Sequence, residues 1–89
     1  MIPRDKIESE ILRLTRASGD ASIGPSAVAQ SLEPQRWRSL LGPVRAAAVI
    51  LCARGRIDIL RKGKPVTPDA VRGVIRLRIR PADPGVPPT

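Results

Sequence analysis

Apolar residues recur every three or four positions through the first half of this chain, which is the period of an amphipathic helix. The pattern predicts helices at residues 3–18, 25–33, 35–41 and 43–54. The third of these is short, because a proline at position 43 disfavours helical geometry at the residue before it. The fourth is apolar around most of its circumference, so we expect it to lie at the centre of the fold.

After Gly55 the period changes from helical to two. Residues 56–61 alternate between apolar and polar, and residues 74–80 alternate strictly, which is typical of half-buried strands. The strict segment sets three apolar residues against three arginines: Ile75, Leu77 and Ile79 against Arg76, Arg78 and Arg80. A basic turn and loop at 62–73, with one helical turn expected at 68–71, connect the segments. We therefore expect a two-stranded hairpin that packs on the helices, because an isolated hairpin is unstable in water.

The order of these elements predicts the fold class. A helix, a short extended segment at 21–23, further helices and a hairpin form a mainly α, winged helix-turn-helix-like domain with a small β-hairpin. One extra short helix precedes the helix in the recognition position. We expect this domain to span residues 1–80. Residues 81–89 contain four prolines and no apolar periodicity, which predicts a disordered, proline-rich tail.

Short runs across residues 7–80 resemble a bacterial family, the domain of unknown function 3253. The matching runs are Pro25-Ser26, Val28-Ala29, Trp37-Arg38, Pro43-Val44-Arg45-Ala46-Ala47-Ala48, Lys62-Gly63, Pro65-Val66, Arg72-Gly73 and Ile75-Arg76-Leu77-Arg78. Members of this family resemble winged-helix proteins, so the resemblance implies the same fold. It implies no functional residues.

Positive charge is concentrated in the second half of the chain. Sixteen Lys and Arg stand against eight Asp and Glu, a net charge of +8. Residues 1–42 have six basic and five acidic residues, a balance of +1, whereas the rest has ten basic and three acidic residues, a balance of +7. Such asymmetry favours a polyanionic partner. The alternative interpretation is an arginine-biased, solvated surface without a partner.

The alternating arginines of residues 74–80 are the main candidate contacts. Two strand steps separate their side chains by about 6.6–7 Å, a spacing similar to that of phosphates along one DNA strand. Guanidinium groups also pair bidentately with phosphate oxygens. The alternative role for the same charges is protection of an exposed sheet edge. The full set of predicted nucleic-acid-binding residues is Arg45, Arg56, Arg61, Lys62, Lys64, Arg76, Arg78 and Arg80.

The predicted recognition helix has few side chains that read bases. Its expected outer stripe is Arg45, Val49, Cys52 and Arg56, of which only the arginines donate to base edges. We therefore expect contacts to the backbone with little sequence preference, with Arg45 as the residue that reaches a base or a groove. The expected partner is a nucleic acid, DNA ahead of RNA. The alternative is an adaptor that uses the winged-helix scaffold to bind an acidic protein.

Composition excludes several other functions. The chain has no His, Tyr or Phe, and a single Cys and Trp. One cysteine cannot form an internal disulfide or a Cys-based zinc site, so we expect Cys52 to be a packed core residue and Trp37 a partly buried anchor. No nucleophile–base pair and no phosphate-binding glycine loop can be assembled, so we expect no catalysis, cofactor or metal. No apolar run is long enough to span a membrane, which favours a cytoplasmic location. The oligomeric state stays open, and a homodimer is allowed.

Overall fold

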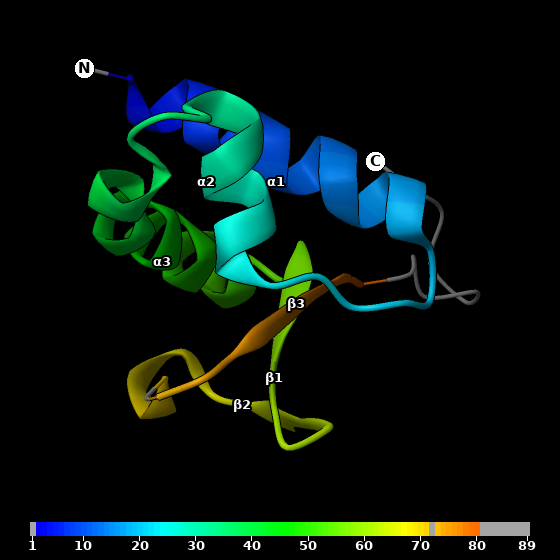
Figure 1. The fold of residues 1–89 in the computed structure, drawn as a ribbon. Helices are drawn as coiled ribbons and strands as arrows, with labels where there is room; N and C mark the ends of the chain where they lie inside the picture. Colours follow the sequence, from blue (N-terminus) through cyan, green and yellow to red (C-terminus); the bar gives the residue numbers. More distant parts are fainter. Residues whose placement is uncertain (1, 72, 81–89) are drawn as a thin grey trace.

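In this computed structural model, residues 2–71 and 73–80 are described. Figure 1 shows helices followed by a small antiparallel sheet, a winged-helix-like arrangement that confirms the predicted fold class. The elements are α1 (Arg4–Ser18), α2 (Pro25–Leu32), α3 (Trp37–Ala53), β1 (Ile57–Arg61), β2 (Lys64–Val66), the 3-10 helix η1 (Pro68–Ala70) and β3 (Arg76–Ile79). The predicted disorder at 81–89 lies outside the described residues.

The first helix follows its sequence pattern. Ile7, Ile11 and Thr15 are its buried residues and lie at successive four-residue steps. The Thr15 hydroxyl donates to the Ile11 carbonyl at 2.7 Å, so this buried polar group is satisfied within its own helix. At the other end of the connection to α2, Pro25 occupies the first turn, where its missing N–H costs no helical hydrogen bond.

The predicted break at position 43 is wrong, because residues 37–53 form one continuous helix with Pro43 inside it. Gly42 has no Cβ, which removes part of the clash between a proline ring and the residue before it. Pro43 also leaves the Ser39 carbonyl without its helical donor, but both residues are exposed, so water can supply that bond. Leu41 and Val44 pack on the same core on either side of the proline, which favours the uninterrupted helix.

The sheet has three strands rather than the predicted two, in the order β2-β1-β3. β1 pairs antiparallel with both neighbours, and the β1–β2 hairpin closes at Lys62-Gly63. Both turn residues have positive φ, 54° and 81°, as the two-residue type I′ turn requires. Lys64 and Pro65, expected in the turn, therefore belong to β2, an edge strand that tolerates proline.

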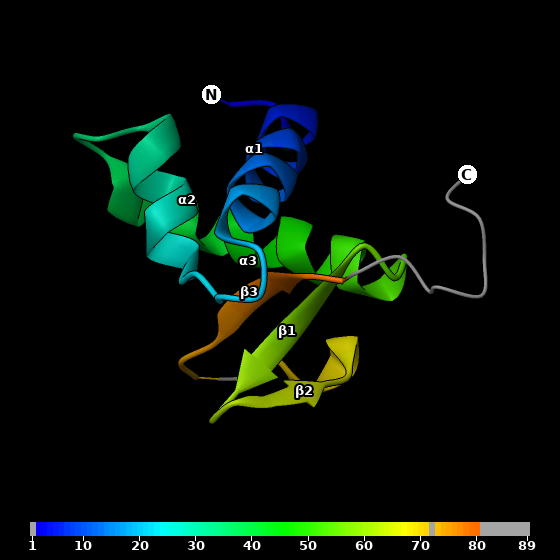
Figure 2. The same ribbon diagram turned by 90° about the vertical axis from the view of Figure 1, so that its right-hand side faces the viewer.

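The three helices lie together on one side of the sheet (Figure 2). The buried core joins α3 to β1 and β3 through residues such as Leu51, Ile59 and Leu77. The short extended segment predicted at 21–23 also joins the sheet, because Ile23 exchanges two backbone hydrogen bonds with Leu77, at 2.8 and 2.6 Å. We call the β1–β2–β3 sheet with its loops the wing. In Figures 1 and 2 its hairpin turn lies at the far end of the molecule from α1.

Two predictions about single side chains are confirmed and one is adjusted. Cys52 is a packed core residue, 8% exposed, and Trp37 is a half-buried anchor against the core. On β3, Leu77 is fully buried but Ile79 is only half-buried, because Ile79 is the last residue of the strand. The alternation that the sequence shows is therefore realised, with its apolar face turned to the helices.

Candidate nucleic-acid interface

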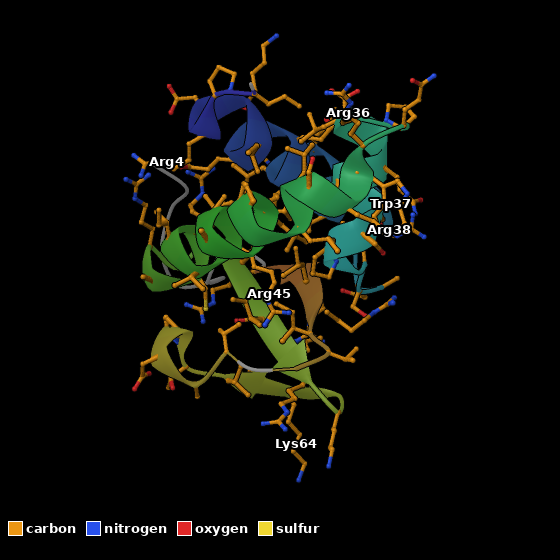
Figure 3. All side chains as sticks on the ribbon, turned by 60° about the vertical axis from the view of Figure 1, so that its left-hand side comes forward. Arg4, Arg36, Trp37, Arg38, Arg45 and Lys64 are labelled. Carbon is orange, nitrogen blue, oxygen red and sulfur yellow. The ribbon has the colours of Figure 1, made fainter. Side chains whose placement is uncertain are left out.

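The tip of the wing presents three cationic side chains to solvent. Arg61 ends β1, Lys62 lies in the type I′ turn, and Lys64 begins β2 opposite Arg61 in the strand register. All three residues are exposed. Among the described residues, none gives these three side chains a hydrogen bond or an ion pair. Figure 3 shows Lys64 extending away from the body of the molecule. Their full charge is thus directed outward.

Arg76 and Arg78 of β3, and Arg80 directly after the strand, are held by intramolecular contacts rather than free in solvent. Arg76 donates from Nε to the Ser22 hydroxyl at 3.1 Å and from Nη2 to the Ser22 carbonyl at 2.7 Å. Arg78 and Arg80 share the carboxylate of Asp58, with closest N–O distances of 3.6 and 2.9 Å. Asp58 faces Arg78 directly in the strand register, which explains the pairing. The predicted row of arginines exists, and its side chains are fixed in orientation.

These contacts cancel little of the wing's charge. Both oxygens of Ser22 are neutral, so Arg76 keeps its full positive charge. Asp58 provides a single negative charge for two guanidinium groups. The remaining acidic residue of the described wing, Asp69, is exposed in η1. Two acidic residues of α1 are occupied elsewhere, since Glu8 pairs with Arg4 at 3.4 Å and with Arg54 at 3.6 Å, and Glu10 pairs with Arg13 at 2.6 Å. The wing therefore stays strongly positive.

Arg45 joins α3 to the wing. It is half-buried, and its Nη1 donates to the Gly73 carbonyl at 2.8 Å, shortly before β3 begins. In Figure 3 its side chain lies between α3 and the sheet. Arg56 is exposed at the α3–β1 junction, at the opposite end of β1 from the turn. The structure thus places five of the eight predicted residues on the sheet and its turn, Arg80 directly after β3, and Arg45 and Arg56 where α3 meets the sheet.

The predicted outer stripe of the recognition helix is wrong. Cys52 is buried and Val49 is half-buried against the core. The four-residue row that begins at Arg45 runs along a flank of α3, and η1 packs against this helix. The residues that α3 exposes are instead small or weakly polar: Ser39, Gly42, Pro43, Ala46 and Ala53, together with Arg38 at its start. Of these, only Arg38 and Ser39 near the start of the helix can donate to a base edge, and the exposed residues from Gly42 to Ala53 offer no such side chain.

Sequence reasoning missed a second basic group beside Trp37. Arg36 and Arg38 are both exposed, and the Arg38 guanidinium lies 4.6 Å from the centroid of the indole ring. Figure 3 shows Arg36, Trp37 and Arg38 together at the start of α3. The sequence signal for this basic group is a Trp followed by an Arg at the start of a helix. The stacking covers one face of the indole, so Trp37 is not an open platform for a base.

Hydrogen bonds to Glu10 link α1 to α2, away from the wing. Glu10 accepts from Arg13 at 2.6 and 2.7 Å and from the Ser31 hydroxyl. The hydrogen bonds from Arg13 and then from Ser31 stabilise the ionised form and lower the pKa of Glu10 from 4.5 to about 2. This contact fixes α2 on α1 and leaves the charge of the wing unchanged.

The described residues bring no three His, Cys, Asp or Glu side chains together in a way that could hold a metal ion. In the same part of the chain, every helix is too short or too polar to cross a membrane.

Comparison with known proteins adds a family. No curated protein matches this chain closely enough to count as a relative. The sequence profile of the family described as "Protein of unknown function (DUF3253)" matches residues 4–80, which includes every described helix and strand. The winged-helix-like domain with its basic wing therefore belongs to the DUF3253 family of proteins of unknown function.

Proposed function

We propose that this domain binds nucleic acid, DNA ahead of RNA, through the backbone and with little sequence preference, and that it performs no catalysis. The observation that carries the proposal is the wing tip, where Arg61, Lys62 and Lys64 are exposed and have no partner among the described residues. Cations in this state neutralise phosphates and release counterions, which is the main source of non-specific affinity.

Arg76 and Arg78 of β3, with Arg80 directly after the strand, add a second set of cations to the wing. Their hydrogen bonds to Ser22 and Asp58 fix the guanidinium groups before any ligand binds, so less side-chain entropy is lost on binding. Arg76 uses Nε and Nη2 for Ser22, which leaves its Nη1 for a phosphate oxygen. In the strand register Arg61 and Lys64 lie on the face of Ile59, whereas Arg76 and Arg78 lie on the opposite face with Asp58, so both faces of the sheet carry positive charge.

The exposed face of α3 supports backbone contact rather than base reading. Gly42, Pro43 and Ala46 have no side-chain donor or acceptor, so the helix cannot distinguish base pairs in a major groove through them. We therefore expect affinity in the non-specific range, with a Kd of about 10⁻⁴–10⁻⁶ M at physiological salt. About six phosphate contacts would give a slope of log K against log salt near −5.

A salt titration of duplex and single-stranded probes tests the proposal. Fluorescence anisotropy is measured for the parent and for Arg61→Gln/Lys64→Gln between about 50 and 200 mM salt. The double variant should bind every probe more weakly and flatten the slope by about two units, because each lost phosphate contact contributes about 0.9. Both residues are exposed on strands, so the fold should persist.

The matched control is Lys6→Gln/Arg16→Gln, which removes two exposed charges from α1. It changes net charge equally and should leave the slope nearly unchanged. Equal effects of both variants would show that net charge alone drives binding and would contradict a role for the wing. A parent that binds no probe at low salt would overturn the proposal and leave the acidic-protein alternative.

A further inference from the structure

An apolar groove lies between the start of α1 and the first half of α3. It has a volume of about 470 Å³, within the range of ligand sites. Its apolar lining is Ile2, Ile7, Leu40, Pro43 and Ala46, and its polar members are Arg4 and Ser39. The groove is far from the tip of the wing, and binding there is independent of the nucleic-acid binding proposed above.

Small residues on α3 keep the groove open. Pro43 and Ala46 lie one turn apart on the helix, and neither side chain is long enough to fill the space opposite Ile2 and Ile7. Beside them, a Cβ on Gly42 would meet no atom within 4 Å. Proline costs about 3 kcal/mol relative to alanine in a helix interior, so Pro43 is a poor choice for helix stability alone. Its position in the groove is consistent with a role for Pro43 other than folding.

Cations lie at both ends of this face. Arg4 lines the groove and is exposed, with one carboxylate partner, Glu8. Arg38 is exposed at the start of α3, next to the groove residue Ser39. Helix α3 contains no acidic residue in its described range, Trp37–Ala53. Figure 3 shows Arg4 near one end of this face and Arg38 near the other.

We propose that this groove docks an acidic, amphipathic segment of a partner protein. Apolar side chains at helical spacing would enter the groove, and carboxylates on the adjoining face would meet Arg4 and Arg38, in the helix-in-groove mode of recognition. A nucleic acid fits poorly, because the lining is mostly apolar. A second copy of this chain is disfavoured by the net charge of +8 that each copy brings.

Selection from a phage-displayed library of random peptides tests the proposal. Peptides enriched on the parent should share carboxylates and apolar residues three or four positions apart. Their affinity should fall about tenfold or more in Ala46→Glu, which places a negative charge in the groove. The matched control is Ala27→Glu, the same change at an exposed helical alanine on α2. It should bind the peptides as the parent does.

Three results would overturn the inference. One is a library that yields no enriched acidic peptide. Another is a set of peptides that lose more affinity with Arg61→Gln/Lys64→Gln than with Ala46→Glu, which would place them on the wing as generic polyanions. The last is a parent that sediments as a dimer and an Ala46→Glu variant that sediments as a monomer, which would identify a second copy as the occupant.

Discussion

The wing tip and the exposed face of α3 are both open to solvent, but they carry opposite kinds of surface. At the tip, Arg61, Lys62 and Lys64 are exposed cations without a partner among the described residues. On α3, Gly42, Pro43 and Ala46 are exposed without any polar side-chain group. The helix in the recognition position therefore has an exposed face without base-reading side chains at these residues. The exposed positive charge lies on the sheet instead.

The two regions also differ in how their cations are held. The tip side chains are unrestrained, whereas Arg76, Arg78 and Arg80 are tied to Ser22 and Asp58 on their own sheet or beside it. Arg45 is likewise held, because its guanidinium donates to the Gly73 carbonyl. The difference separates an unrestrained set of cations from a fixed one.

Leu51→Ala should have the largest effect, because both regions rest on the same core. Leu51 is 2% exposed on the inner face of α3. We expect the free energy of unfolding to fall by about 2–5 kcal/mol, the range for truncation of a buried leucine. In a domain this small that loss is a large part of the total stability. Urea unfolding measures it, and a loss below about 1 kcal/mol would show that the core is not centred on this residue.

Pro43→Ala should change the face of α3 and leave the wing unaltered. An alanine restores a donor to the Ser39 carbonyl and removes a ring from a helix interior, so the free energy of unfolding should rise by about 1–3 kcal/mol. Nucleic-acid binding should not change. A destabilised variant, measured in the same urea experiment, would mean that the helix depends on the proline.

Asp58→Asn should strengthen nucleic-acid binding by the wing and leave the exposed face of α3 unaltered. Removing the shared carboxylate releases Arg78 and Arg80 for phosphates, so binding should tighten and the salt slope should steepen by about one unit. The free energy of unfolding should fall by about 1 kcal/mol at most, because both arginines are partly exposed. Asp69→Asn, at an exposed position in η1, is the control for the change in net charge. Weaker binding by Asp58→Asn would show that the fixed orientation matters more than the charge.

The loss of the Glu10 contact at low pH should have the smallest effect on stability. It should alter neither the wing tip nor the exposed face of α3. The folded pKa of Glu10 lies at about 2, below its ordinary value of 4.5. Its contribution to stability is therefore full above pH 4.5 and is lost as the pH falls toward 2. Thermal unfolding should show Glu10→Gln less stable than the parent at neutral pH and equal to it near pH 2. An unchanged difference across that range would contradict the assigned contact with Arg13 and Ser31.

Local patterning was enough to predict most elements of this fold. The four-residue steps of α1 and the strict alternation before Arg80 each depend on neighbours in the sequence, so periodicity finds them. The continuous α3 could not be predicted, because a proline is tolerated there only through packing of Leu41 and Val44 on a core that the helix shares with other elements.

The residues of the candidate site could be predicted from the sequence, but their intramolecular contacts could be predicted less well. The cations were identified from charge asymmetry, and the structure gathers most of them on the sheet. Their partners lie far away in the sequence, since Arg76 meets Ser22 and Arg45 meets Gly73. Such contacts depend on how the chain folds back, which no local pattern contains. The half-buried position of Val49 was missed for the same reason, because its packing on the core depends on the other elements of the fold.

The most direct test of the division between wing and helix is an NMR titration of the ¹⁵N-labelled protein with a short duplex DNA. The account predicts that amide shifts concentrate at Arg61, Lys62, Gly63 and Lys64 and along β3, and that they weaken together as salt is raised. Amides at Ser39, Gly42 and Ala46 should stay near their free positions. Large shifts on that face of α3, with the wing tip unmoved, would contradict the account.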